Sequence, residues 1–318
     1  RIIINRPKRQ ESIRRDLPSN YVLLPRQAMV HSICQSLLPV FRLDLINVHI
    51  SIDMEGVSGV VHTDQTGQKG YDYNMMRKAM TLEANAAIEG SFEAGATTVV
   101  VNDSHGSMRN LLPYMLDQRA ELISGSPKPL GMMQGVDDNS DISMCIGYHS
   151  RPGEKGILSH TIRGSSVVQH FYINDKPSSE FEINAGIAGY YNVAIGMIAG
   201  DSDIVNDAKN LIPNIIGAPV KATINKFSAK NLSGNETFKL IKNKAIECVE
   251  NYQEFKPIKY KTPVKMSVEF TSDLMADVVS FIPGIKRESR QVITFESQDY
   301  IEAWKCMYAS ILLAGIPY

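Results

Sequence analysis

The sequence has few cysteines, no long apolar run and no excess of one charge. Cys34, Cys145, Cys248 and Cys306 lie far apart with no CxxC pair, which excludes a disulfide framework and a thiolate zinc site and is typical of reduced cysteine in a cytoplasmic protein. No run of about 18 apolar residues is present, so we expect no membrane span. The 33 basic and 34 acidic side chains give a net charge of -1, which indicates neither a nucleic-acid nor a membrane partner.

The remaining composition is that of a globular protein, and its length of 318 residues favours two domains over one. Residues 1–45 differ from the rest because they are rich in arginine and interrupted by prolines. Such a leader is either a targeting segment or an extension of doubtful order, and we favour the extension. We expect residues 46–225 to form an α/β domain and residues 226–318 a smaller α+β domain.

Strand and helix patterns alternate from Ile46 onward. The pattern predicts helices over residues 72–94 and about 202–211. It predicts strands in the runs INVHISI (46–52), TTVVV (97–101), ELISG (121–125), DISMCIGY (141–148), VAIGMIAGD (193–201) and PVKATI (219–224). This alternation is typical of an α/β fold with a mostly parallel sheet between two layers of helices.

Other segments complete the expected secondary structure. The runs GILSHTI (156–162) and VVQHFYIND (167–175) are predicted to be paired strands, and Ser178 or Ser179 is predicted to cap a helix from Glu180. In the tail, a capping box at Ser233 opens a helix, and residues 264–270 alternate as a half-buried strand does. A short helix, a strand near 291–296 and a final helix follow.

Polar residues of two kinds follow three of the predicted strands. Asp53 and Glu55 follow the first strand, His105 follows the second, and His149 follows the strand at 141–148. Ligands of open α/β sheets bind at the carboxyl ends of the strands, where loops converge. Oxygen and nitrogen donors without thiolate suit zinc, with manganese or cobalt as competitors. Taken singly, each residue also has a structural explanation, in a turn, a cap or a loop.

Ten short sequence words occur in an order that resembles the zinc D-aminopeptidase family associated with dipeptide-transport operons. The resemblance is dense over about residues 46–225, continues weakly to the C-terminus and has no counterpart in the first 45 residues. The words are SIDMEGVSGV (51–60), MTLEANAAI (80–88), VNDSHGSM (101–108), ELISGSPKP (121–129), GYHS (147–150), LSHTI (158–162), HFYINDKPSSE (170–180), NAGIAGYYN (184–192), MIAGD (197–201) and PVK (219–221).

The resemblance implies two zinc ions per subunit and assigns roles to six residues. The family's metal ligands fall on Asp53, Glu55, His105, His149 and Glu180, with Asp53 as the bridge, and its catalytic histidine falls on His160. From the residues alone and taken singly, the helix dipole explains Glu180 and a core position explains His160, and each of these structural explanations is favoured over a functional role. The stretch 163–169 is slightly longer than the family pattern, which leaves substrate preference less certain than metal binding.

The resemblance also implies an activity: a two-zinc activated water that removes N-terminal D-amino acids from short peptides such as D-Ala-D-Ala. It further implies a ring-like homo-oligomer, decameric in the family. One alternative is a two-metal phosphoesterase, against which we note no Arg or Lys set beside the cluster. Another is a non-catalytic peptide-binding accessory of a transporter.

Overall fold

The computed structural model describes residues 45–164 and 166–316. The predicted extension at residues 1–45 lies outside these described residues, apart from Leu45, and so does Cys34. Among the helices in the described ranges, none has both the length and the apolar character needed to cross a membrane.

A seven-stranded sheet carries the first part of the fold. Its strand order is β3-β2-β1-β4-β7-β8-β9, and every neighbouring pair is parallel except β8 with β9. The strands are β1 (Ile46–Ile52), β2 (Ala96–Asp103), β3 (Glu121–Ile123), β4 (Ile142–Tyr148), β7 (Ala194–Asp201), β8 (Ile216–Asn225) and β9 (Ser228–Asn231). The central strands are buried on both faces, as their continuous apolar runs indicate.

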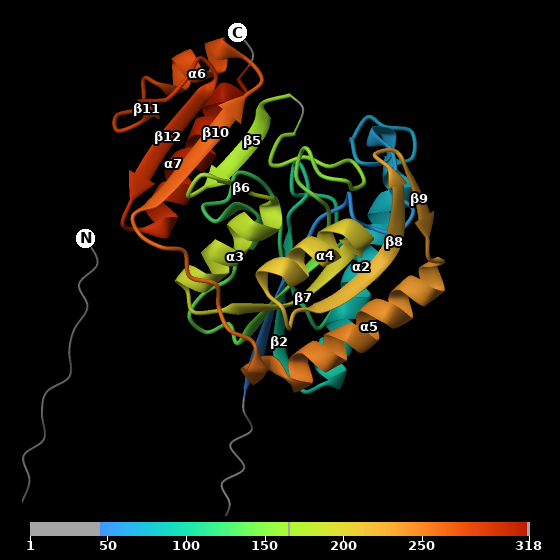
Figure 1. Ribbon diagram of the computed structural model, residues 1–318. Helices are drawn as coiled ribbons and strands as arrows, with labels where there is room; N and C mark the ends of the chain where they lie inside the picture. The colour runs from blue at the N-terminus through green and yellow to red at the C-terminus, as the bar shows by residue number, and fades with distance from the viewer. Residues whose placement is uncertain (1–44, 165, 317–318) are drawn as a thin grey trace, which may run out of the picture. The chain divides into compact units, whose positions relative to one another are not determined.

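Helices cover both faces of this sheet (Figure 1). On one face, Ile50 of β1 packs in the same core as α2 (Tyr73–Glu93) and α5 (Gly234–Glu250). On the other face, Ile198 of β7 shares a core with α3 (Glu180–Tyr190) and α4 (Ser202–Leu211). The α3 helix begins at the predicted cap, since the Ser179 side chain accepts the Glu182 backbone N–H. The predicted three-layer α/β architecture is confirmed.

A second, antiparallel sheet has the order β11-β12-β10-β5-β6. Its strands are β5 (Val168–Ile173), β6 (Lys176–Pro177), β10 (Val264–Phe270), β11 (Lys286–Arg287) and β12 (Val292–Ser297), with helices α6 (Asp273–Val279) and α7 (Tyr300–Ala314). In Figure 1 the yellow-green β5 lies beside the orange β10, although about 90 residues separate them. The pairing of β5 with β10 therefore joins segments on the two sides of the predicted domain boundary near residue 225. That boundary stays a prediction.

The expected strand at residues 156–162 is wrong. The segment is irregular because Leu158 and Ile162 adopt positive φ angles of 49° and 33°, which lie outside the extended region of regular strands. Its backbone N–H groups also donate to scattered partners, that of Leu158 to the Lys226 carbonyl and that of His160 to the Ser150 carbonyl. Three short 3-10 helices that the sequence did not predict are η1 (Thr63–Gln65), η2 (Gly131–Met133) and η3 (Tyr252–Glu254).

Candidate metal centre

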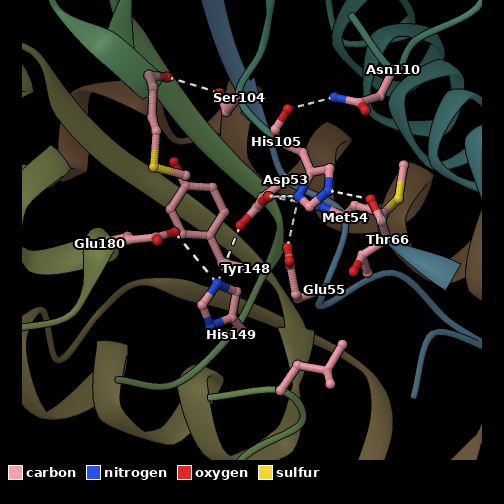
Figure 2. Close-up of polar contacts among 12 residues, drawn as sticks. Asp53, Met54, Glu55, Thr66, Ser104, His105, Asn110, Tyr148, His149 and Glu180 are labelled. Carbon is pink, nitrogen blue, oxygen red and sulfur yellow. Dashed lines mark hydrogen bonds and ion pairs between the residues drawn. The ribbon is translucent and has the colours of Figure 1, made fainter. Parts of the chain in front are cut away.

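The predicted strand-end residues meet at one edge of the large sheet. The strands β2, β1 and β4 are neighbours, so the loops after them lie side by side. His105 Nδ1 lies 3.1 Å from Asp53 Oδ1 and 2.9 Å from Glu55 Oε2. His149 Nε2 lies 3.4 Å from Asp53 Oδ2, so that carboxylate faces a histidine with each of its oxygens (Figure 2).

Glu180 and His160 join the same cluster from other segments. Glu180 is the first residue of α3, and its Oε2 lies 3.4 Å from His149 Nε2. Its other oxygen accepts the Ile162 N–H at 2.8 Å and lies 3.8 Å from His160 Nε2. The rings of His149 and His160 are stacked, with centroids 4.2 Å apart. All six residues singled out in the sequence are therefore brought together.

Two glycines allow the loop after β1 to approach the end of β4 closely. The Gly56 N–H donates to the Gly147 carbonyl at 2.7 Å, and a Cβ at Gly56 would lie 2.0 Å from the Tyr148 carbonyl oxygen. Gly147 has a φ of +70°, and a Cβ there would lie 2.1 Å from the Asp53 carbonyl oxygen. Only glycine fits at these positions, so their substitution would push apart the loops that carry Asp53 and His149.

Each histidine of the cluster is held by a backbone carbonyl. His149 Nδ1 contacts the Ser150 oxygen at 3.0 Å, His160 Nδ1 the Leu158 oxygen at 2.8 Å, and His105 Nε2 the Thr66 oxygen at 2.9 Å. A carbonyl oxygen only accepts, so each of these nitrogens carries the proton. In the neutral ring the other nitrogen then presents a lone pair to the carboxylates, as metal-binding imidazoles do.

The residues fit a divalent metal ion. His149 Nε2 is buried and has no hydrogen-bond partner among the described residues, a costly arrangement for a polar atom unless a ligand completes it. Two groups place one donor atom from each member within 4.8 Å of one another: Asp53, Glu55 and His149, and His149, His160 and Glu180. Carboxylate oxygen with imidazole nitrogen is a donor set that zinc accepts. The second group includes His160, for which the resemblance implies catalysis.

The pKa shifts of the centre also favour a bound cation. Burial by itself raises the pKa of Asp53, but His105 and His149 outweigh it and hold that pKa well below its usual value. Burial also raises the pKa of Glu55, but the neighbouring His105 lowers it by more, so that pKa lies below its usual value. Burial lowers the pKa of each of these two histidines, yet the neighbouring carboxylates raise both well above the usual value. The buried carboxylates thus require positive charge, which protons supply when no metal is bound.

A cavity of about 800 Å³ lies over the centre. It is lined by five of the site residues, Asp53, Glu55, His105, His160 and Glu180. Two arginines and part of α7 also line it, and the sequence analysis did not predict them there. The arginines, Arg109 and Arg163, remove the sequence argument against a phosphoesterase, which relied on the absence of basic residues near the cluster. Their signal was weak because they lie in loops far apart in the sequence.

A buried lysine that the sequence analysis did not assign supports the loop after β1. The Lys221 ammonium donates to the carbonyls of Glu55, Val57 and Val60 at 2.6, 2.9 and 2.6 Å. Burial lowers the pKa of Lys221 to about 8. From α2, Glu83 accepts the Ser58 N–H of the same loop at 2.8 Å. The only sequence signal for Lys221 was its place in the word PVK.

Asp103 holds the loop after β2 in place by hydrogen bonds. Its carboxylate accepts the backbone N–H groups of Asn110 and Leu111 at 2.5 and 2.7 Å and the Asn110 side-chain amide at 2.7 Å. That amide also donates to the His105 carbonyl at 2.6 Å. The contacts of the Asp103 carboxylate are therefore those of a turn residue.

Known proteins are similar to this chain over most of its length. The model of the D-aminopeptidase family matches residues 46–309. A D-aminopeptidase of Bacillus subtilis (strain 168) is 36% identical over 270 residues, which cover 85% of this chain and 98% of the relative. A solved structure, the Zn-dependent D-aminopeptidase DppA from Bacillus subtilis, described as a self-compartmentalizing protease, superposes with a TM-score of 0.81 at 36% identity, covering 86% of this chain and all of that one.

Proposed function

Because this chain belongs to the D-aminopeptidase family, we propose that it is a zinc-dependent aminopeptidase acting on N-terminal D-amino acids of short peptides such as D-Ala-D-Ala. Two zinc ions per subunit are proposed as its cofactor. The fit of the donor set and the family membership support this proposal. Selection of D over L residues rests on the family alone.

The contacts suggest how two ions would be shared. Glu55 and His105, whose nearest atoms lie 2.9 Å apart, would hold one ion, and His149 and Glu180, 3.4 Å apart, would hold the other. Asp53 has one carboxylate oxygen near His105 and the other near His149, so it would contribute to both ions. Bound zinc supplies Lewis-acid activation of water and of the peptide carbonyl.

The chain's own residues would handle the substrate's protons. The His160 side chain is 20% exposed and lines the cavity, whereas that of His149 is 1% exposed. The Leu158 carbonyl holds the His160 proton at Nδ1, which leaves Nε2 to accept a proton and pass it to the leaving amine. His160 is therefore proposed as the catalytic acid–base residue and His149 as a ligand.

His149 Nε2 carries this proposal, because it is buried, lies 3.4 Å from the carboxylates of Asp53 and Glu180 and makes no hydrogen bond to either, which leaves a place for a cation. The test measures zinc per purified chain and hydrolysis of D-Ala-D-Ala, with L-Ala-L-Ala as the matched control and a chelator-treated sample as the blank. We expect bound zinc and turnover of the D-peptide that the chelator abolishes. A zinc-free chain that cleaves neither peptide would contradict the proposal.

A two-metal phosphoesterase remains a second candidate, which Arg109 and Arg163 favour because guanidinium groups hold phosphoryl oxygens. Turnover of p-nitrophenyl phosphate without peptide cleavage would favour the phosphoesterase. Metal binding without turnover of either substrate would favour the non-catalytic peptide-binding accessory of a transporter.

We also propose a cytoplasmic, ring-like homo-oligomer, decameric as in the family, on the strength of the self-compartmentalizing relative. Light scattering of the purified protein measures the subunit number.

A further inference from the structure

One wall of the cavity is apolar and comes from the last helix of the chain. Trp304, Tyr308 and Leu312 of α7 line the same cavity as the site residues His160 and Glu180. They are spaced four residues apart, so one face of α7 supplies all three. Helix α7 therefore forms part of the cavity over the centre, although the proposed metal ligands come from the loops of the large sheet and from α3.

This wall is held rigidly. The Trp304 indole N–H donates to the Pro129 carbonyl at 3.2 Å, and its ring stacks on Tyr308 with centroids 5.0 Å apart. Gly131, which also lines the cavity, has a φ of +55°, and a Cβ there would come within 2.9 Å of the Trp304 ring. Trp304 is 1% exposed and Leu312 is half-buried. Trp304 therefore supports the wall from behind, and Leu312 is a more accessible part of its surface.

We propose that the α7 wall is the subsite for a bulky apolar side chain of the peptide substrate. This inference rests on the proposed peptidase activity. A cavity of about 800 Å³ has the size of sites that take small molecules, and it is continuous with the metal centre. An aromatic or branched apolar side chain buries apolar surface against Tyr308 and Leu312. Alanine offers the wall only a methyl group.

The test compares three dipeptides on zinc-loaded protein: D-Ala-D-Ala, D-Phe-D-Ala and D-Ala-D-Phe. The two aromatic peptides place the bulky side chain on either side of the scissile bond. The variant is Leu312→Ala, and the matched control is Leu313→Ala, the same substitution at the next residue of α7, which does not line the cavity. Zinc per chain and the melting temperature of both variants verify that the centre and the fold are retained.

The wild-type chain is expected to cleave at least one aromatic dipeptide with a higher kcat/KM than D-Ala-D-Ala. Leu312→Ala should lower kcat/KM for that peptide by on the order of 10-fold or more and change D-Ala-D-Ala hydrolysis far less. Leu313→Ala should leave the ratio between the peptides unchanged. A wild-type preference for D-Ala-D-Ala over both aromatic peptides, or an equal loss on all three peptides in Leu312→Ala, overturns the subsite. If the wild-type chain cleaves none of the three, the proposed function fails first and the subsite with it.

Discussion

Replacing His160 with alanine separates catalysis from metal binding in this centre. His160 and His149 are stacked, and both present Nε2 toward Glu180, at 3.8 and 3.4 Å. They differ in access, because the His160 side chain is 20% exposed and that of His149 only 1%. A side chain that exchanges protons with substrate must reach the cavity, so of these two histidines it is His160 that qualifies.

The expected magnitude follows from its role. One positioned acid–base group contributes about 10²–10⁴-fold in rate, equivalent to roughly 3–5 kcal/mol of transition-state stabilisation. The folded state loses one ring stack and the hydrogen bond to the Leu158 carbonyl, each worth about 1 kcal/mol. The loss of activity should therefore far exceed the loss of stability.

The assay measures zinc per chain, the melting temperature and peptide kinetics for His160→Ala beside His149→Ala. We expect His160→Ala to keep its zinc and to lose kcat and kcat/KM together, as removal of a transition-state interaction does. His149→Ala should lose zinc along with activity, with partial recovery in excess zinc. Loss of zinc from His160→Ala would make it a ligand, and near-normal turnover would leave it a structural residue.

Four further substitutions test two of the proposed ligands and two buried residues outside the centre. Asp53→Ala should abolish binding of both ions and Glu55→Ala mainly of one; undiminished zinc per chain in Asp53→Ala would contradict the bridge. Lys221→Met should lower the free energy of unfolding by roughly 3 kcal/mol, because three buried carbonyls lose their donor, and an unchanged denaturation midpoint would refute this. Burial lowers the pKa of His49 to about 4, below its ordinary 6.5, so folding stability is lost as pH falls through 6.5 toward 4. In chelator, His49→Gln should remove about 2 kcal/mol of the stability difference between pH 7 and pH 5, measured by chemical denaturation.

The strand ends could be predicted because they depend on local pattern. Each β-branched run that stops at a carboxylate or a histidine marks the end of a buried strand, and parallel strands place such ends at one edge. Asp53, Glu55, His105 and His149 were found in this way. Glu180 and His160 could not be, because neither follows a strand of the large sheet; only the family resemblance singled them out.

The segment around His160 shows why local pattern fails there. Its residues GILSHTI read as a strand, yet the backbone turns through two positive φ angles to bring Ile162 N–H onto Glu180 and His160 onto His149. That conformation is imposed by partners distant in sequence, which outweigh the preference of Ile157 and Ile162 for extended backbone.

The α7 wall depends on an even longer-range arrangement. The second sheet takes β5 from before residue 225 and β10 from after it, while α5, which also follows residue 225, packs with α2 on the large sheet. A chain cut at the predicted boundary would leave β5 without its neighbour and the large sheet without one of its helices. The indole N–H of Trp304 in α7 donates to the Pro129 carbonyl, across the same boundary. The substrate cavity is thus a product of both sheets, and a sequence pattern, which reports one element at a time, carries no signal for it.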